Sequence, residues 1–445
     1  MSVNLLLKEY KVYKMRRHRK RRCISKGMQK MLSRTTSSLV VYSRPNMIRA
    51  LRYIPTSLKI FFLKKTIIEK NARKLVWVPE IFSFKENYNE TIFFFETLLS
   101  SFFYTDGNVI VDFSRCSSAS VSVFIQLSII LEELHLFLEK FNSGLVRKNK
   151  KWFKIIPAKN IKVLKFLSVF NIYKSSELKK LPQDDQYLLL ELQRGKLKNS
   201  YKENRKGVVG NLVVAFVNNA IRPYNLEIND DGRGFLGSMM GEVLSNAEDH
   251  SFKGSEWFVG GTAFKEKNLG DEVIELNLAI VNFGDSMYEG FEKTKSRNNE
   301  NYQMVLKGYE YHKSIMRGGK YTFGKEGLYT MLMLNEGISR LKYEKDSRGN
   351  GTIDFLDAFI ALGQYGRVND KFMSQLNIIS GHTVVTCDDD VKPYQSGTMR
   401  VVSLNKTQSQ KHLPDEDYLR DYVGYFPGTI LECRIYLNKK NLNRI

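Results

Sequence analysis

Apolar positions between residues 70 and 170 alternate between short runs and longer periodic stretches. The short runs are bounded by turn residues and rich in β-branched or aromatic side chains, and they predict strands in KLVWVPEIFSF, NVIVDFS and WFKIIP. The longer stretches have the i, i+3, i+4 spacing of helices and comprise NETIFFFETLLSSFFY, a segment that begins near Val121, and NIKVLKFLSVF. Strands that alternate with helices predict a small α/β domain over residues 51–195.

The pattern changes after the polar stretch KLKNSYKENRKG, and residues 196–445 predict a second domain. Two helices come first, NLVVAFVNNAI and the one that contains GEVLSNAEDHS, and the strands SEWFVGGTAF and VIELNLAIVNFG follow them. A long loop, the helix LYTMLMLNEGI and the strands HTVVTC, TMRVVSL and GTILECRIYL complete the chain. Successive strands with helices grouped among them predict an α/β sandwich, in which helices cover one face of a mixed sheet.

The composition is that of a globular protein, because 42% of the 445 residues are hydrophobic and 26% are charged. No run approaches the roughly 18 consecutive apolar residues that a membrane helix needs. The four cysteines stand far apart without CxxC or Cys/His ligand spacing, so we expect neither a zinc site nor a disulfide framework. No membrane span and no secretory signal are expected, and a cytoplasmic location fits best.

Residues 1–50 form a strongly basic segment, which we expect to be a flexible arm. They hold 14 Lys or Arg against the single acid Glu9, and so carry +13 of the net charge of +22. Residues 8–34 can contact the phosphates of nucleic acid or of another polyanion, which gives affinity without sequence specificity. A solvated tail is the alternative.

Two polar residues in GEVLSNAEDHS suit chemistry on a nucleotide. Glu242 and Asn246 stand four residues apart, so their side chains project from one face of a helix. The Glu242 carboxylate can take a proton from an attacking water, and the Asn246 amide oxygen can bind a hard cation such as Mg²⁺. Taken alone, the pattern is more typical of a solvated helix face, so the interpretation depends on its surroundings.

The segment LAIVNFGDSM predicts a buried strand that ends at Asn282 and is followed by Gly284. A polar side chain at a strand end can meet the edge of an adenine ring, and a glycine lets the base approach the backbone. Thr429, which we expect at the start of a late strand, can support the base or a neighbouring water with its hydroxyl.

A glycine-rich turn stands directly ahead of a helix in RGGKYTFGKEGLYTML. Gly318, Gly319, Gly324 and Gly327 leave backbone N–H groups to point from the helix N-terminus, an arrangement that binds anions. The same glycines predict a mobile lid.

In this order, the Glu-x-x-x-Asn helix, the strand that ends near a glycine, the Gly-rich lid and the late Gly-Thr strand resemble the motif set of the GHKL ATPases. The resemblance covers residues 205–445, and GEVLSNAEDHS is most similar to the version found in anti-sigma serine kinases, where a His follows the Asn. It implies a GHKL or Bergerat-type fold, ATP and Mg²⁺ as cofactors, Glu242 as the residue that activates water, and Asn246 as the Mg²⁺ ligand. The residues that it implies at the nucleotide are Asn246, Asn282, Gly284, Gly319, Gly324, Lys325, Gly327, Leu328 and Thr429.

The strand motif departs from the family pattern Asp-x-Gly-x-Gly, in which the Asp accepts a hydrogen bond from the adenine amino group. Here Asn282 takes the Asp position, Gly284 is kept and Ser286 replaces the second glycine. An amide is a weaker acceptor than a carboxylate, so adenine recognition has less support than the Mg²⁺ site. Two similar stretches, NDDGRG at 229–234 and SRGNG at 347–351, are expected to be turns, because their order or context does not fit.

The N-terminal segment NVIVDFSRCSSASVSVFIQLSIILEEL resembles the strand, Ser-rich turn and helix of STAS domains, the antagonists that anti-sigma kinases phosphorylate on serine. This resemblance implies that Ser117, Ser118 or Ser120 lies near a modified serine. The alternative, that these serines cap a helix and fill a turn, stays open.

The sequence as a whole predicts an ATP-binding protein that hydrolyses ATP slowly and whose lid closure regulates the STAS-like domain or a protein partner. Two alternatives stay open: a protein serine kinase of the anti-sigma type, and a nucleic-acid-binding protein with a degenerate nucleotide site. A homodimer also stays open.

Overall fold

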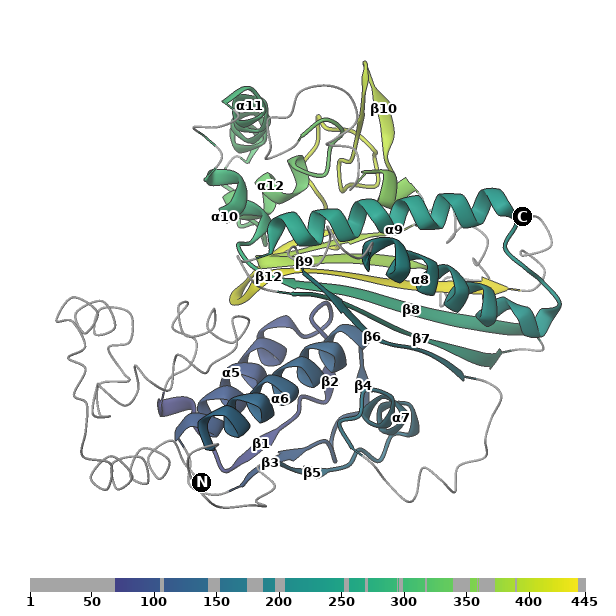
Figure 1. Cartoon of the computed structure of the whole chain (residues 1–445). Helices are drawn as coiled ribbons and strands as arrows, with labels where there is room; N and C mark the ends of the chain where they lie inside the picture. Colours follow the sequence, from purple (N-terminus) through teal and green to yellow (C-terminus); the bar gives the residue numbers. More distant parts are fainter. Residues whose placement is uncertain are drawn as a thin grey trace, which may run out of the picture. The chain divides into compact units, whose positions relative to one another are not determined.

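The computed structural model describes residues 69–104, 108–142, 153–173, 187–196, 205–251, 256–268, 271–293, 295, 299–316, 318–338, 353–357, 359, 373–388 and 390–438. The predicted basic arm and the SRGNG stretch lie outside these residues. The chain divides into two compact units with a boundary between residues 180 and 181, and each unit is described by itself (Figure 1).

The first unit is a small α/β domain. Its helical segments are η2 (Glu69–Asn71), α5 (Tyr88–Tyr104), α6 (Val121–Asn142) and α7 (Ile161–Val169). Its strands are β1 (Leu75–Trp77), β2 (Ile81–Phe82), β3 (Val109–Asp112), β4 (Ser118–Ala119) and β5 (Phe153–Ile156). The strands β1, β3 and β5 form a parallel sheet in the order β1-β3-β5, and β2 pairs with β4, also in parallel. Parallel strands need long crossovers, which the helices supply, so the predicted α/β alternation is confirmed.

Aromatic packing stabilises this first unit. Phe82 and Phe94 meet edge to face with ring centroids 4.9 Å apart, and Phe113 stacks on Phe124. The predicted strand end at Asp112 and helix start at Val121 are both confirmed.

The serines between these two elements make contacts within the turn. Ser117 Oγ donates to the carbonyl of Glu80 at 3.2 Å, and Ser120 Oγ lies 3.0 Å from Ser122 Oγ. Ser117 and Ser118 are exposed, whereas Ser120 is buried. Modification of one of these serines stays a prediction.

The second unit contains one large sheet with helices against it. Its helical segments are α8 (Arg205–Ile221), η5 (Arg222–Tyr224), α9 (Asp230–His250), α10 (Met287–Glu292), α11 (Asn299–Ile315) and α12 (Lys325–Leu332). The sheet consists of β6 (Tyr187–Gly195), β7 (Trp257–Asn268), β8 (Asp271–Phe283), β9 (Gln375–Cys387) and β12 (Leu419–Asn438), in the order β6-β7-β8-β12-β9. A separate two-stranded ribbon pairs β10 (Tyr394–Ser396) with β11 (Met399–Val401).

The helices α8 and α9 lie side by side along one face of this sheet (Figure 1). Val243 and Leu244 of α9 share a core with Leu276, Leu278 and Ile280, which are alternate residues of β8. The alternation follows from the period of two along a strand, which sends every second side chain toward the helices. The predicted α/β architecture is therefore confirmed at this level.

The sheet is antiparallel throughout its described pairs, and the prediction of a mixed sheet is wrong. The strands β7 and β8 pair directly along their lengths, which a short connection between them allows. The strand β12 then enters between β8 and β9, antiparallel to both.

Two predicted boundaries also differ. The strand β6 ends at Gly195 and pairs with β7, so it belongs to the second unit, and the domain boundary lies ahead of the predicted residue 195. The polar stretch that suggested the boundary follows β6. Thr429 lies well inside β12, which begins at Leu419, so it is not at the start of a strand.

Two predicted loops are helical. The stretch 229–234 begins α9, because the Asn229 side chain caps it and accepts from the Gly232 N–H at 2.7 Å. The long loop after Asn282 contains α10 and α11, and α10 starts with a capping box between Ser286 and Glu289. No helix in the described ranges is long and apolar enough to cross a membrane.

Candidate functional site

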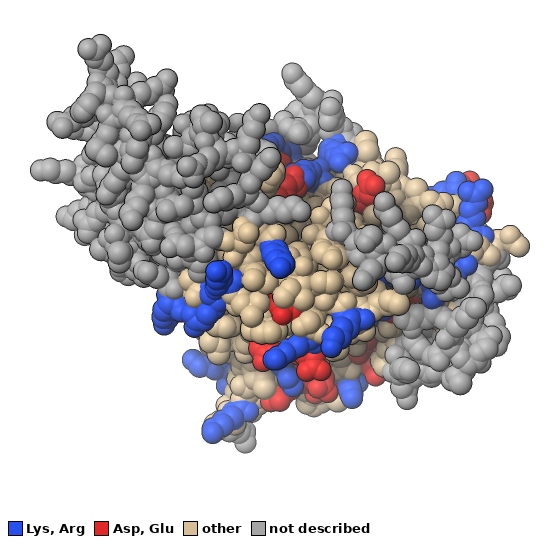
Figure 2. Space-filling model, turned by 90° about the horizontal axis from the view of Figure 1, so that it is seen from below, with Lys and Arg blue, Asp and Glu red and all other residues tan. Residues whose placement is uncertain are grey.

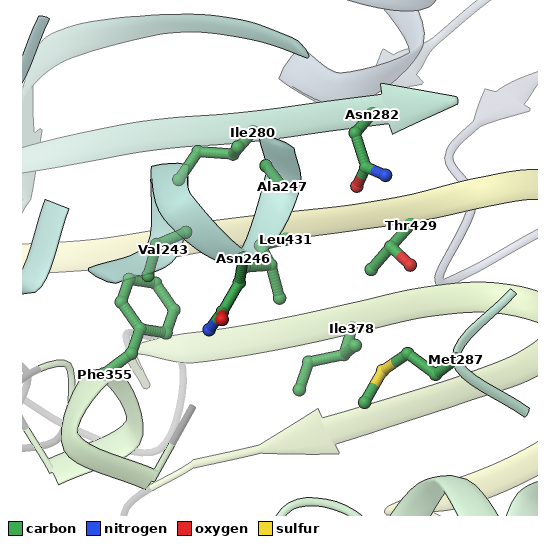
Figure 3. A pocket seen from close by; sticks show the side chains of 10 residues that line it. All are labelled: Val243, Asn246, Ala247, Ile280, Asn282, Met287, Phe355, Ile378, Thr429 and Leu431. Atoms are coloured by element: carbon green, nitrogen blue, oxygen red, sulfur yellow. The ribbon is translucent and has the colours of Figure 1, made fainter. Parts of the chain in front are cut away.

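A small cavity of about 60 Å³ opens between α9 and the sheet of the second unit (Figure 3). Ten side chains from α9, the sheet, α10 and the segment 353–357 line it: Val243, Asn246, Ala247, Ile280, Asn282, Met287, Phe355, Ile378, Thr429 and Leu431. The cavity brings together three of the predicted site residues, Asn246, Asn282 and Thr429, which are far apart in the sequence.

The helix α9 turns one face to this cavity. Val243, Asn246 and Ala247 have the i, i+3, i+4 spacing of a single helix face, and all three line the cavity. Glu242 is exposed and is not among the lining residues. At 3.6 residues per turn, it lies about a quarter of a turn from the centre of that face. Asn246 is therefore placed at the cavity, whereas Glu242 lies on the neighbouring, exposed part of the helix surface.

The adjacent strands β8 and β12 bring Asn282 and Thr429 together, because these two residues are direct partners in the antiparallel register. Asn282 is only 4% exposed, and its Nδ2 atom has no hydrogen-bond partner in the part of the chain that the structure describes. A buried amide without a partner is costly, typically about 1–3 kcal/mol. The Asn282 side chain lies close to the Thr429 side chain in the cavity (Figure 3).

A hydroxyl pair anchors Thr429. Its Oγ1 lies 3.0 Å from Ser380 Oγ, which donates to the Gly428 carbonyl at 2.9 Å and accepts from the Met287 N–H at 2.9 Å. Ser380 and Met287 were not predicted as site residues. The Ser286-x-x-Glu289 capping box that positions Met287 is visible in the sequence, whereas the pairing that brings Ser380 beside Thr429 is not.

The size of the cavity limits what it can enclose. Ligand pockets usually measure about 300–1,000 Å³, so the enclosed space suits the edge of a planar base and not a whole nucleotide. A sugar and phosphates would therefore extend beyond it. Aliphatic side chains of Ile280, Ile378 and Leu431 surround the polar groups and suit the faces of such a ring.

The N-terminus of α12, the predicted phosphate cradle, is occupied by a carboxylate of the same chain. Asp421 Oδ2 accepts from the N–H groups of Gly324 at 2.7 Å and Gly327 at 3.2 Å, and its Oδ1 accepts from Thr383 Oγ1 at 2.6 Å. An anion at a helix N-terminus is stabilised by free N–H groups and by the helix dipole. The predicted glycines thus bind an anion here, and that anion is Asp421.

Further carboxylates gather around this end of α12. The His382 N–H donates to Glu326 Oε1 at 2.9 Å, and the Tyr425 hydroxyl donates to Glu289 Oε2 at 2.5 Å. Burial raises the pKa of the Glu326 carboxyl, with Asp421 and Glu289 adding to the effect against the bond from His382. So much negative charge opposes a phosphate in this arrangement.

The remaining predicted residues do not line the cavity. Lys325 Nζ lies 3.0 Å from Glu292 Oε1 and 4.9 Å from the Tyr329 ring centroid. The Leu328 side chain is fully buried in the core, and its N–H bonds to the Gly324 carbonyl, so it offers no group to a ligand. Gly319 is exposed on the turn. Gly284 directly follows β8, where its N–H donates to the Pro427 carbonyl at 3.3 Å.

A Mg²⁺ ion at this site would need ligands from the nucleotide. No cluster of three or more His, Cys, Asp or Glu side chains suited to a metal occurs among the described residues. Mg²⁺ commonly uses one or two protein oxygens and completes its shell with phosphates and water. Asn246, which faces the cavity, fits the part of that single protein ligand.

Comparison of the chain with models of protein families, with curated proteins and with solved structures gives no match.

Replacing Asp421 by alanine is expected to lower the free energy of unfolding by about 2 kcal/mol, because it leaves three donors without their acceptor. Asp421→Asn keeps one oxygen acceptor and should lose about half as much. Chemical denaturation of the full chain measures both. Equal stability of wild type and Asp421→Ala would mean that this carboxylate does not hold α12.

Proposed function

We propose that the second unit is a GHKL-type nucleotide-binding module that binds ATP with Mg²⁺ and hydrolyses it slowly. One observation carries the proposal: a single cavity is lined by Asn246, Asn282 and Thr429, the three residues that the family resemblance assigns to Mg²⁺ and the base. They come from three separate elements, α9, β8 and β12.

Each residue has a separate task in this proposal. Asn282 hydrogen-bonds the edge of the base, and Thr429 supports it. The Asn246 oxygen binds Mg²⁺, which neutralises phosphate charge and orients the triphosphate. Glu242, on the neighbouring, exposed part of the helix surface, takes the proton of the attacking water.

The contact between Asp421 and α12 suggests how nucleotide binding regulates other parts of the protein. Along β9, Thr383, which bonds Asp421, comes three positions after Ser380, a distance of at most about 10 Å at the rise of an extended strand. A phosphate chain that leaves the cavity toward α12 would compete with Asp421 for the N–H groups of Gly324 and Gly327. Release of Asp421 would then free α12 to move as a lid, which signals to the STAS-like domain or to a protein partner.

The nucleic-acid alternative depends on residues 1–50, which the structure does not describe. On the face shown in Figure 2, Lys and Arg side chains lie among Asp and Glu side chains, without a continuous basic stripe over the described residues. This face provides no support for a nucleic-acid track.

Isothermal titration with ATP, with and without Mg²⁺, tests the proposal directly. We expect wild type to bind ATP more tightly with Mg²⁺, and Asn246→Ala to lose most of the Mg²⁺ effect, because it removes the protein oxygen that binds the metal. Ser245→Ala, a change at the neighbouring helix position, is the control. Absence of ATP binding by the wild-type chain at millimolar concentration would refute the proposal. Label from γ-labelled ATP on protein serine would redirect it to the serine-kinase alternative.

A further inference from the structure

The base-recognising position of the cavity carries an amide where the resembling family has a carboxylate, and this difference has consequences for ligand choice. A carboxylate only accepts hydrogen bonds, whereas an amide has an accepting oxygen and a donating NH₂ group. Asn282 is 4% exposed and its Nδ2 atom has no partner in the residues that the structure describes. This residue lines the cavity, and its amide donor is buried without an acceptor among the described residues.

Among the described residues, no hydrogen bond fixes which end of this amide points into the cavity. Turning the Asn282 amide by half a turn about its terminal bond exchanges oxygen and nitrogen at nearly the same positions. Its register partner Thr429 is engaged with Ser380, and not with Asn282, by the bonds seen among the described residues. The Asn282 amide can therefore present either its oxygen to a ligand donor or its NH₂ group to a ligand acceptor.

The hydroxyl pair beside Asn282 offers an acceptor. Ser380 Oγ has one hydrogen, which goes to the Gly428 carbonyl at 2.9 Å. Since Ser380 Oγ lies 3.0 Å from Thr429 Oγ1, the Thr429 hydroxyl then donates to Ser380. The lone pairs of Thr429 are left to accept from a ligand N–H or from water.

Two classes of purine fit these groups. A 6-amino purine such as adenine donates from its amino group to Asn282 Oδ1. A 6-oxo purine such as hypoxanthine accepts at its oxygen from Asn282 Nδ2, and its ring N–H at position 1 matches the Thr429 acceptor. A carboxylate at residue 282 would instead repel the 6-oxo group, because two acceptors would face each other.

We infer that this cavity binds 6-oxo purine nucleotides about as well as 6-amino purine nucleotides, and that Asn282 sets this broad specificity. The inference rests on the proposed nucleotide-binding function and adds the substrate class to it.

Titration of the full chain with ATP and with inosine triphosphate, both with Mg²⁺, tests the inference. The two ligands differ at position 6 of the base and in the proton at position 1. We expect the dissociation constants of the two ligands for wild type to agree within about threefold, which is a difference in binding free energy of less than about 1 kcal/mol. In Asn282→Asp, inosine triphosphate should bind at least tenfold more weakly, while ATP binds as tightly as in wild type or more tightly. Asn225→Asp, an exposed site just after η5, controls for the added charge.

The outcomes separate the inference from the function on which it rests. Binding of ATP at least tenfold tighter than inosine triphosphate in wild type would overturn the inference and leave the proposed function intact. If neither nucleotide binds wild type, the proposed function fails and the inference fails with it. The wild-type ratio needs no variant, so it decides the matter even if Asn282→Asp does not fold.

Discussion

Replacement of Glu242 by alanine is expected to reduce phosphate release from ATP at least a hundredfold and to leave ATP affinity within about twofold of wild type. A positioned general base typically contributes a factor of about 10²–10⁴, so its removal should eliminate most turnover. Binding should survive because Glu242 is exposed on α9 and does not line the cavity, whereas Asn246 and Asn282 do. Steady-state phosphate release and isothermal titration on the same preparations measure the two effects.

Two controls make this result specific. Glu242→Gln keeps the size of the side chain but replaces the basic carboxylate by a neutral amide. Its rate of phosphate release should therefore fall as far as that of the alanine variant. Asp230→Ala removes a carboxylate whose side chain is 99% exposed in the first turn of the same helix, and it should keep wild-type turnover. Wild-type turnover in Glu242→Ala would show that another group activates water. Loss of ATP binding in Glu242→Gln would instead give Glu242 a role in holding the nucleotide.

The sequence was informative wherever a local pattern determines the structure. The strand end at Asp112 and the helix start at Val121 follow from short β-branched runs and from helical periodicity, and both are confirmed. Helical spacing also predicts Glu242 and Asn246 on one face of α9, but only Asn246, together with Val243 and Ala247, lines the cavity. Such features depend on neighbours within a few residues, which the sequence displays directly.

The sequence was less informative where distant segments meet. The capping role of Asp421 depends on its approach to Gly324, nearly a hundred residues earlier in the chain. The same glycine pattern predicts a phosphate cradle whether or not such a carboxylate is present, because both depend on the free N–H groups of a helix N-terminus. The placement of Ser380 beside Thr429 is also set by the register of β9 on β12, which is irregular near Phe426.

Local signals were also present that the periodicity did not reveal. Asn229 and Ser286 each start a helix by accepting a backbone N–H, in stretches that the glycine and polar content predicted to be loops. In both cases the cap favours the helix more strongly than glycine or polar residues disfavour it. The capping box of Ser286 marks the start of α10 in the sequence, but the packing of Met287 at the cavity depends on Ser380, far along the chain.

The second large effect is expected for replacement of Gly428, which should change both the stability of the sheet and the geometry of the cavity. Gly428 has φ +136°, and a Cβ atom there would lie 2.0 Å from the Asn282 carbonyl oxygen. The added methyl group meets rigid backbone on β8, and the backbone conformation itself is strained for any other residue. Gly428→Ala should therefore lower the free energy of unfolding by about 4 kcal/mol, from overpacking and strain together.

A second glycine separates these two causes. Gly397, in the turn between β10 and β11, has φ +62° and nothing within 4 Å of an added Cβ atom. Gly397→Ala carries the backbone strain without the clash and should cost only about 1 kcal/mol. Urea denaturation of both variants measures the difference, which reports on the close approach of β12 to β8. Because this approach also aligns Thr429 with Asn282, Gly428→Ala should weaken nucleotide binding even at temperatures where it is folded. Equal losses of stability in the two variants would mean that the strands do not approach as closely as the register requires.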